Sequence, residues 1–191
     1  RGAPHTGALM AGAGARRVLL VDDRAPRAAA GSGFPRTLDL LRDLAARPDL
    51  TVAVLPTIAA DVTAESGVAA LGVEVLRGDF EEQLVGFAPD LVVLSRPHNA
   101  HRAIPVVRAR CPHTVVVVDV EALVHRRLQQ EAEVVGDPAR RERLAAEVDR
   151  VAEMERDIVR GADLVVCLSV DEREWIEGVE GHPPVAFVPP W

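Results

Sequence analysis

The chain of 191 residues contains no lysine and no tyrosine, and all 22 of its basic residues are arginine. The absence of lysine excludes reactions that need a side-chain amine, such as Schiff-base formation. We interpret the abundance of alanine, valine and arginine as the mark of a GC-rich bacterial coding sequence. Cysteine is also scarce: Cys111 and Cys167 lie in apolar stretches, which is typical of reduced, buried thiols in a cytoplasmic protein.

Long apolar runs are missing as well, since none approaches the roughly 20 residues that cross a bilayer. The glycine- and alanine-rich start lacks the apolar core of a signal peptide, so we expect residues 1–15 to be a disordered lead-in. Residues 16–191 are then long enough to form one domain with a sizeable core. The net charge of -7 argues against a non-specific nucleic-acid binder. It does not exclude small anionic ligands, because an acidic protein can hold a local basic pocket.

What is present is an alternation of short β-branched runs with helical stretches along the rest of the chain. Several runs are apolar on both faces, as buried parallel strands are. The alternation therefore predicts an α/β fold with a doubly wound parallel sheet, which is Rossmann-like. The expected strands cover residues 17–22, 50–55, 73–76, 90–95, 114–119, 163–169 and 184–188. The expected helices cover residues 35–46, 64–71, 79–87, 104–110 and 138–160.

Polar side chains follow several of the predicted strands, where doubly wound folds bind their ligands. In VVVVDVEALVHRR the apolar run ends at Asp119, and Glu121, His125 and Arg127 follow. Arg96 comes directly after another predicted strand. These residues are candidates for a ligand site at the carboxyl edge of the sheet. Helix capping explains the two acids equally well on spacing alone.

A glycine-containing turn precedes the first predicted helix. It consists of Gly31, Ser32 and Gly33, and Arg36 falls in the first turn of the helix. Free N–H groups at a helix start attract phosphate or carboxylate groups, so we predict an anion-binding loop here. A flexible turn without a chemical role explains the glycines equally well. The loop matches neither the dinucleotide-binding nor the P-loop fingerprint. No set of His and Cys has the spacing of a metal site, so we predict none.

Two segments, VLLVDD and DLVVLS, are similar to those of response-regulator receiver domains. In that family an aspartate takes the phosphoryl group where this chain has Ser95. The family also needs a lysine after its fifth strand, and this chain contains none. The chain is longer than a receiver domain too. We therefore exclude a working receiver.

A broader resemblance extends over residues 16–191. It is carried, in order, by VDDRAPRAAAGSGFPRTLDLLRDL, LGVEVL, FAPDLVVLSRP, VVVDVEALVHRR, EMERDIVRGADLVVCLSVDERE and VAFVPP. The order and spacing of these segments resemble the N-terminal half of bacterial GT-B glycosyltransferases of the family-four group. In that group a C-terminal domain with a glutamate pair holds the nucleotide sugar. The resemblance therefore implies that this chain is the acceptor-side domain, without the donor domain, and is inactive alone.

The function that this resemblance implies is sugar transfer in the cytoplasm. A retaining, metal-independent enzyme would move a hexosyl group from a UDP- or GDP-type sugar to a glycan, lipid or small-molecule acceptor. The nucleotide sugar is a co-substrate, and no cofactor is expected. A lipid acceptor would bring peripheral membrane contact. Catalytic or orienting roles are expected for Asp119, Glu121 and His125, and substrate or phosphate contacts for Gly31, Ser32, Gly33, Arg36, Arg96 and Arg127.

Two alternatives from other functional classes remain at the level of the sequence. One is a non-catalytic half-GT-B domain that binds or regulates a partner, and a second polypeptide supplying the donor half would argue against it. The other is a small-molecule-binding Rossmann enzyme, such as an NAD-dependent one. The missing glycine fingerprint weighs against this enzyme.

Overall fold

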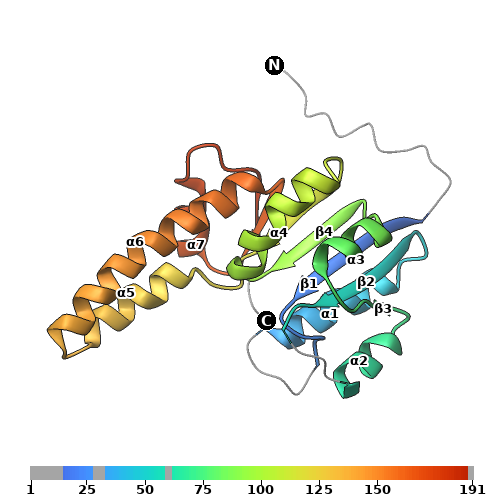
Figure 1. Ribbon diagram of the computed structural model, residues 1–191, viewed down its shortest axis with the longest axis horizontal. Helices are drawn as coiled ribbons and strands as arrows, with labels where there is room; N and C mark the ends of the chain where they lie inside the picture. Colours follow the sequence, from blue (N-terminus) through green and yellow to red (C-terminus); the bar gives the residue numbers. More distant parts are fainter. Residues whose placement is uncertain (1–14, 28–32, 59–61, 189–191) are drawn as a thin grey trace.

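Seven parallel strands form one sheet within the residues that the computed structural model describes, which are 15–27, 33–58 and 62–188 (Figure 1). The strands are β1 (Arg16–Asp22), β2 (Leu50–Pro56), β3 (Glu74–Val75), β4 (Leu91–Ser95), β5 (Val115–Asp119), β6 (Leu164–Cys167) and β7 (Val185–Phe187). Their order in the sheet is β3-β2-β1-β4-β5-β6-β7. The doubly wound parallel sheet predicted from the sequence is confirmed.

The described helices connect the strands. They are α1 (Phe34–Ala45), α2 (Val62–Ala69), α3 (Phe80–Phe87), α4 (Pro97–Arg110), α5 (Val124–Val134), α6 (Pro138–Gly161) and α7 (Val170–Glu177). None of the helices in the described part of the chain combines the length and the apolar character needed to cross a membrane.

The two faces of the sheet carry separate cores, because successive strand residues point to opposite faces. Leu19 and Val21 of β1 pack on the face covered by α3, α4, α6 and α7. Val18 and Leu20 pack on the other face, where α1 and α2 are the described helices that contribute side chains. Right-handed crossovers produce this division, because connections running in opposite directions from the middle of the sheet place their helices on opposite faces.

Helices α5 and α6 form a hairpin that extends away from the sheet (Figure 1). Helix α6 was predicted, and its N-cap is Asp137, whose side chain accepts the Ala139 N–H at 3.0 Å. Helix α5 was not predicted, because it buries one residue, His125, and so lacks an apolar stripe.

Other differences between the prediction and the structure have local causes. Helix α4 begins at Pro97, seven residues before the predicted start at 104, because proline suits the first helical position. Helix α7 was missed, and the polar residues after β6 prove to be its capping box, formed by Ser169 and Glu172. The predicted third strand shrinks to the two residues of β3. Of the two free cysteines, Cys167 is buried as expected, whereas Cys111 is half-buried.

Candidate functional site

The direction of the chain through the sheet reverses between β1 and β4. The chain passes outward from β1 to β3 on one side and from β4 to β7 on the other. Such a switch point is where doubly wound sheets bind ligands, beyond the carboxyl ends of their strands. Asp22 ends β1, Asp119 ends β5, and Arg96 follows the last residue of β4. The fold therefore brings three charged side chains to the edge where a ligand is expected.

Arg96 joins the ends of three strands. Its Nε lies 2.7 Å from Oδ1 of Asp22 and 3.5 Å from Oδ2 of Asp23, and its Nη1 lies 3.1 Å from Oε2 of Glu121. Its guanidinium also stands over the ring of Phe34 in α1, 4.8 Å from the ring centre. The backbone of Arg96 has a φ of 76°, a conformation that non-glycine residues seldom adopt. Several contacts hold this arginine in its strained position.

Arg36 and Asp119 form the second ion pair of the site. Arg36 lies in the first turn of α1 and donates a hydrogen bond from Nη2 to Oδ2 of Asp119. Both side chains are largely buried, with exposed fractions of 15% and 6%. The other carboxylate oxygen of Asp119 accepts the backbone N–H of Glu121 at 3.3 Å. The structure thus brings together four of the residues selected from the sequence, Arg36, Arg96, Asp119 and Glu121.

Gly33 and Glu121 are in direct contact across the site. A Cβ atom at Gly33 would lie 2.5 Å from Oε1 of Glu121, and Gly33 has a φ of 81°. Only glycine meets both conditions without strain. Glu121 has an unusual φ of 52°. Within the described residues, its Oε1 and Oδ2 of Asp22 are buried without a hydrogen-bond partner. The two predicted loop residues before Gly33, Gly31 and Ser32, lie outside the described residues.

Burial changes the acid–base properties of the carboxyl groups. Desolvation raises the pKa of Glu121 from its ordinary 4.5 to about 7, although the nearby charge of Arg96 lowers it. Burial also raises the pKa of Asp22, against the hydrogen bond from Arg96. Burial likewise raises the pKa of Asp119, against the charge of Arg36. Glu121 can therefore both accept and release a proton near neutral pH, as a general acid or base must.

A polar rim that is not among the candidates selected from the sequence continues from β1 to α4. Oδ1 of Asp23 lies 2.6 Å from Nε2 of His98 and accepts a hydrogen bond from Nδ2 of Asn99 at 3.0 Å. The Thr57 hydroxyl donates to Oδ1 of Asn99, also at 3.0 Å. The sequence contained a signal for this rim, since the two α4 residues lie three and four positions after the end of the predicted fourth strand at residue 95. Together with Arg96 they surround a carboxylate-rich edge that can accept hydrogen bonds from hydroxyl groups.

The remaining candidates lie elsewhere. His125 is buried, its Nδ1 lies 2.5 Å from Oε2 of Glu155, and its ring centre lies 4.7 Å from that of Trp175. Arg127 is exposed on α5. Within the described residues, neither side chain forms a hydrogen bond or ion pair with Asp119 or its neighbours. Their direct roles in chemistry stay predictions.

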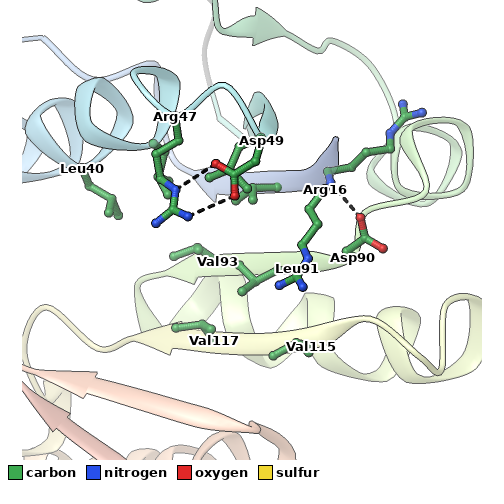
Figure 2. A pocket seen from close by; sticks show the side chains of 13 residues that line it. Arg16, Leu40, Arg47, Asp49, Asp90, Leu91, Val93, Val115 and Val117 are labelled. Carbon is green, nitrogen blue, oxygen red and sulfur yellow. Dashed lines mark hydrogen bonds and ion pairs between the residues drawn. The ribbon is translucent and has the colours of Figure 1, made fainter. Parts of the chain in front are cut away.

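A cavity of about 390 Å³ opens at the opposite edge of the sheet (Figure 2). One wall carries the pair Arg47 and Asp49, whose Nη2 and Oδ2 are 3.0 Å apart. The strands contribute an apolar floor, which contains Leu91, Val93, Val115 and Val117. The cavity faces the amino ends of β1, β4 and β5, where parallel sheets do not usually bind ligands. We therefore place the candidate site at the carboxyl edge.

In residues 15–27, 33–58 and 62–188, no group of three or more His, Cys, Asp or Glu side chains is arranged to hold a metal ion. The acids of the site are instead paired with guanidinium groups, which occupy part of their hydrogen-bonding capacity.

Among known protein families, curated proteins and solved structures, only solved structures are similar to the chain. No protein-family model and no curated protein matches the chain. Its structure is similar to a sucrose-phosphate synthase from Thermosynechococcus elongatus, with a TM-score of 0.58 and 14% identity over 91% of this chain and 48% of that one. It is also similar to an uncharacterized sugar kinase from Pyrococcus horikoshii, with a TM-score of 0.52 and 10% identity over 88% of this chain and 68% of that one.

At these identities the likeness establishes the fold. The chain is a doubly wound, Rossmann-like α/β domain of the kind found in the sucrose-phosphate synthase. It spans about half the length of the synthase that it matches.

Proposed function

We propose that the chain is the N-terminal, acceptor-side half of a cytoplasmic bacterial glycosyltransferase of the GT-B type, similar to the family-four group. The complete enzyme would transfer a sugar from a nucleotide-sugar donor to an acceptor, in a cleft between this domain and a donor-binding domain. The observation that carries the proposal is the pairing of Arg36 with Asp119 and of Arg96 with Glu121 at the switch point. The likeness to half of a sucrose-phosphate synthase supports it.

The chemistry of the cluster fits sugar transfer. The carboxylates of Asp119 and Glu121 accept hydrogen bonds from acceptor hydroxyl groups, and Glu121 takes up or releases a proton near neutral pH because of its raised pKa. Arg36 and Arg96 supply fixed positive charge for the diphosphate that leaves the donor. Charge that is already oriented by neighbouring groups need not reorganise during the reaction. Retention of configuration and independence from metals are part of the same proposal.

The direct test is a transfer assay. We expect the protein encoded by the complete reading frame to transfer sugar from UDP-glucose or GDP-mannose to a sugar acceptor, and the 191-residue chain alone to transfer none. In the complete protein, Asp119→Asn should lower kcat at least about tenfold, the effect of losing roughly 1.4 kcal/mol of transition-state stabilisation. The matched control is Asp39→Asn, because Asp39 pairs with Arg42 at the exposed surface of α1.

Circular dichroism of the Asp119→Asn protein separates loss of chemistry from loss of fold. A folded variant with unchanged turnover would remove Asp119 from the proposed site. A complete protein that transfers no sugar from any nucleotide-sugar donor would overturn the proposed function as a whole.

The ion pairs formed within the site also fit a second candidate function. In this alternative, the domain binds sugars and catalyses no reaction. Arg36 and Arg96 already have carboxylate partners in the structure, so a neutral ligand could bind without leaving a charge unpaired. This candidate predicts that the complete protein binds methyl glucoside, with a dissociation constant measurable by calorimetry, and yet transfers nothing to it.

A further inference from the structure

Glu155 is a buried acid in the C-terminal third of helix α6, with an exposed fraction of 2%. Its Oε1 accepts the backbone N–H of Val124 at 2.6 Å. Its Oε2 lies 2.5 Å from Nδ1 of His125 and accepts the backbone N–H of that residue at 3.4 Å. Acids are almost never fully buried unless they are paired, so this carboxylate has a specific structural role.

That role lies at the start of α5. The N-cap position of α5 is occupied by Leu123, which offers no side-chain cap to the free N–H groups of the first turn. Glu155 reaches across from α6 and accepts two of these N–H groups. A carboxylate at a helix N-terminus also interacts favourably with the helix dipole. Glu155 therefore caps α5 from a neighbouring helix.

The capped helix starts directly after the candidate site. The chain runs from Asp119, the last residue of β5, through Glu121 to the start of α5 at Val124. Glu121 has a φ of 52°, a conformation that is unfavourable for a non-glycine residue and persists only where the surroundings fix it. The strand fixes one end of this segment, and Glu155 fixes the other.

We propose that Glu155 is a positioning residue for the candidate site. By holding the start of α5, it keeps the carboxylates of Asp119 and Glu121 against Arg36 and Arg96. His125 shares in this role, since its ring is held by Glu155 on one side and packs on Trp175 of α7. The catalytic part of this inference rests on the proposed function, but the positioning part does not.

The variants Glu155→Ala and Glu155→Gln test the inference. Alanine removes both hydrogen-bond acceptors of the carboxylate. Glutamine has a side chain of nearly the same size and keeps one acceptor oxygen, but it loses the charge. The matched control is Glu147→Gln, because Glu147 lies on the same helix with an exposed side chain. Melting temperatures identify any variant that does not fold, and glutamine serves if alanine fails.

The first readout does not depend on activity. In the isotopically labelled chain, NMR titration of the Glu121 carboxyl group should give a midpoint near 7 in the parent and in Glu147→Gln. Glu155→Ala should lower this midpoint by at least one unit, and Glu155→Gln by less, because a loosened loop exposes the carboxyl group to water. An unchanged midpoint in a folded Glu155→Ala chain would overturn the inference.

The second readout is turnover in the complete protein with UDP-glucose as donor. Glu155→Ala should lower kcat about tenfold and leave the KM for UDP-glucose within twofold. The arginines of this domain are proposed to act on the diphosphate as it leaves, whereas the donor domain binds UDP-glucose before the reaction. A tenfold change in this KM with unchanged kcat would contradict a role in positioning Asp119 and Glu121. A parent enzyme without turnover would contradict the proposed function. The NMR titration would still test the role of Glu155, because it does not depend on activity.

Discussion

The Nε atom of Arg96 lies 2.7 Å from Oδ1 of Asp22, a carboxylate whose side chain is completely buried. This pair joins the ends of β1 and β4, the two strands at which the direction of the chain through the sheet reverses. A second hydrogen bond to Asp22 comes from the backbone N–H of Asp23, at 2.6 Å. The Arg96 guanidinium therefore links the two strands that flank the switch point.

We expect Arg96→Ala to be strongly destabilising. The substitution leaves Asp22 charged and buried without its cation, and removing one partner of a buried pair typically costs about 3–5 kcal/mol. Urea unfolding measures the change. Arg42→Ala is the control, since its pair with Asp39 is exposed and such pairs contribute roughly 0–1 kcal/mol. Equal losses of unfolding free energy in the two variants would show that the buried pair stabilises the fold no more than the exposed pair does.

Gly33→Ala should disturb Glu121 as well as the backbone. The new Cβ would lie 2.5 Å from Oε1 of Glu121, and alanine at a φ of 81° costs about 1–2 kcal/mol in addition. Gly72→Ala separates the two effects, because Gly72 has a φ of 80° and no atom within 4 Å of its Cβ position. Urea unfolding should show a larger loss for Gly33→Ala. Losses of the same size would mean that Glu121 moves aside without cost.

The raised pKa of Glu121 makes stability depend on pH. The folded chain keeps this proton up to about pH 7, whereas the unfolded chain releases it near the ordinary value of 4.5. The contribution to stability is therefore complete below pH 4.5 and is lost as the pH rises through 7. Relative to Glu121→Gln, the parent chain should lose roughly 3 kcal/mol of unfolding free energy between these limits.

Urea unfolding of both chains at several pH values measures this difference. Asp22 and Asp119 also have a raised pKa, but they are present in both chains and cancel in the comparison to first order. A difference that stays constant from pH 4.5 to 8 would contradict a buried, proton-holding Glu121. In the complete enzyme, we expect the pH dependence of kcat/KM to show an inflection near 7 that Glu121→Gln removes.

The sequence predicted that residues of the candidate site would come together, because their positions follow from strand geometry. Parallel strands end at one edge, so residues directly after predicted strands, such as Arg96 and Asp119, had to lie near one another. Arg36 joined them because the helix after the first strand starts at the same edge. The pairing of Arg36 with Asp119 agrees with this reasoning.

Other features depend on contacts that no local pattern contains. In the sequence, Glu155 is one of many acids on a charged helix, and nothing local distinguishes it. Its partner in the structure, His125, lies 30 positions away. Helix α5 is stabilised by packing on α6 rather than by an apolar stripe of its own. Arg96 and Glu121 have positive φ angles, which no pattern in the sequence predicts.

The most direct test of the site is an NMR map of amide shifts in the labelled chain as UDP-glucose, glucose 6-phosphate and methyl glucoside are added. We expect the largest shifts at Gly33, Arg96 and Glu121, on the carboxyl edge of the sheet. Shifts confined to Leu91 and Val115, at the apolar cavity of the amino edge, would contradict the account (Figure 2).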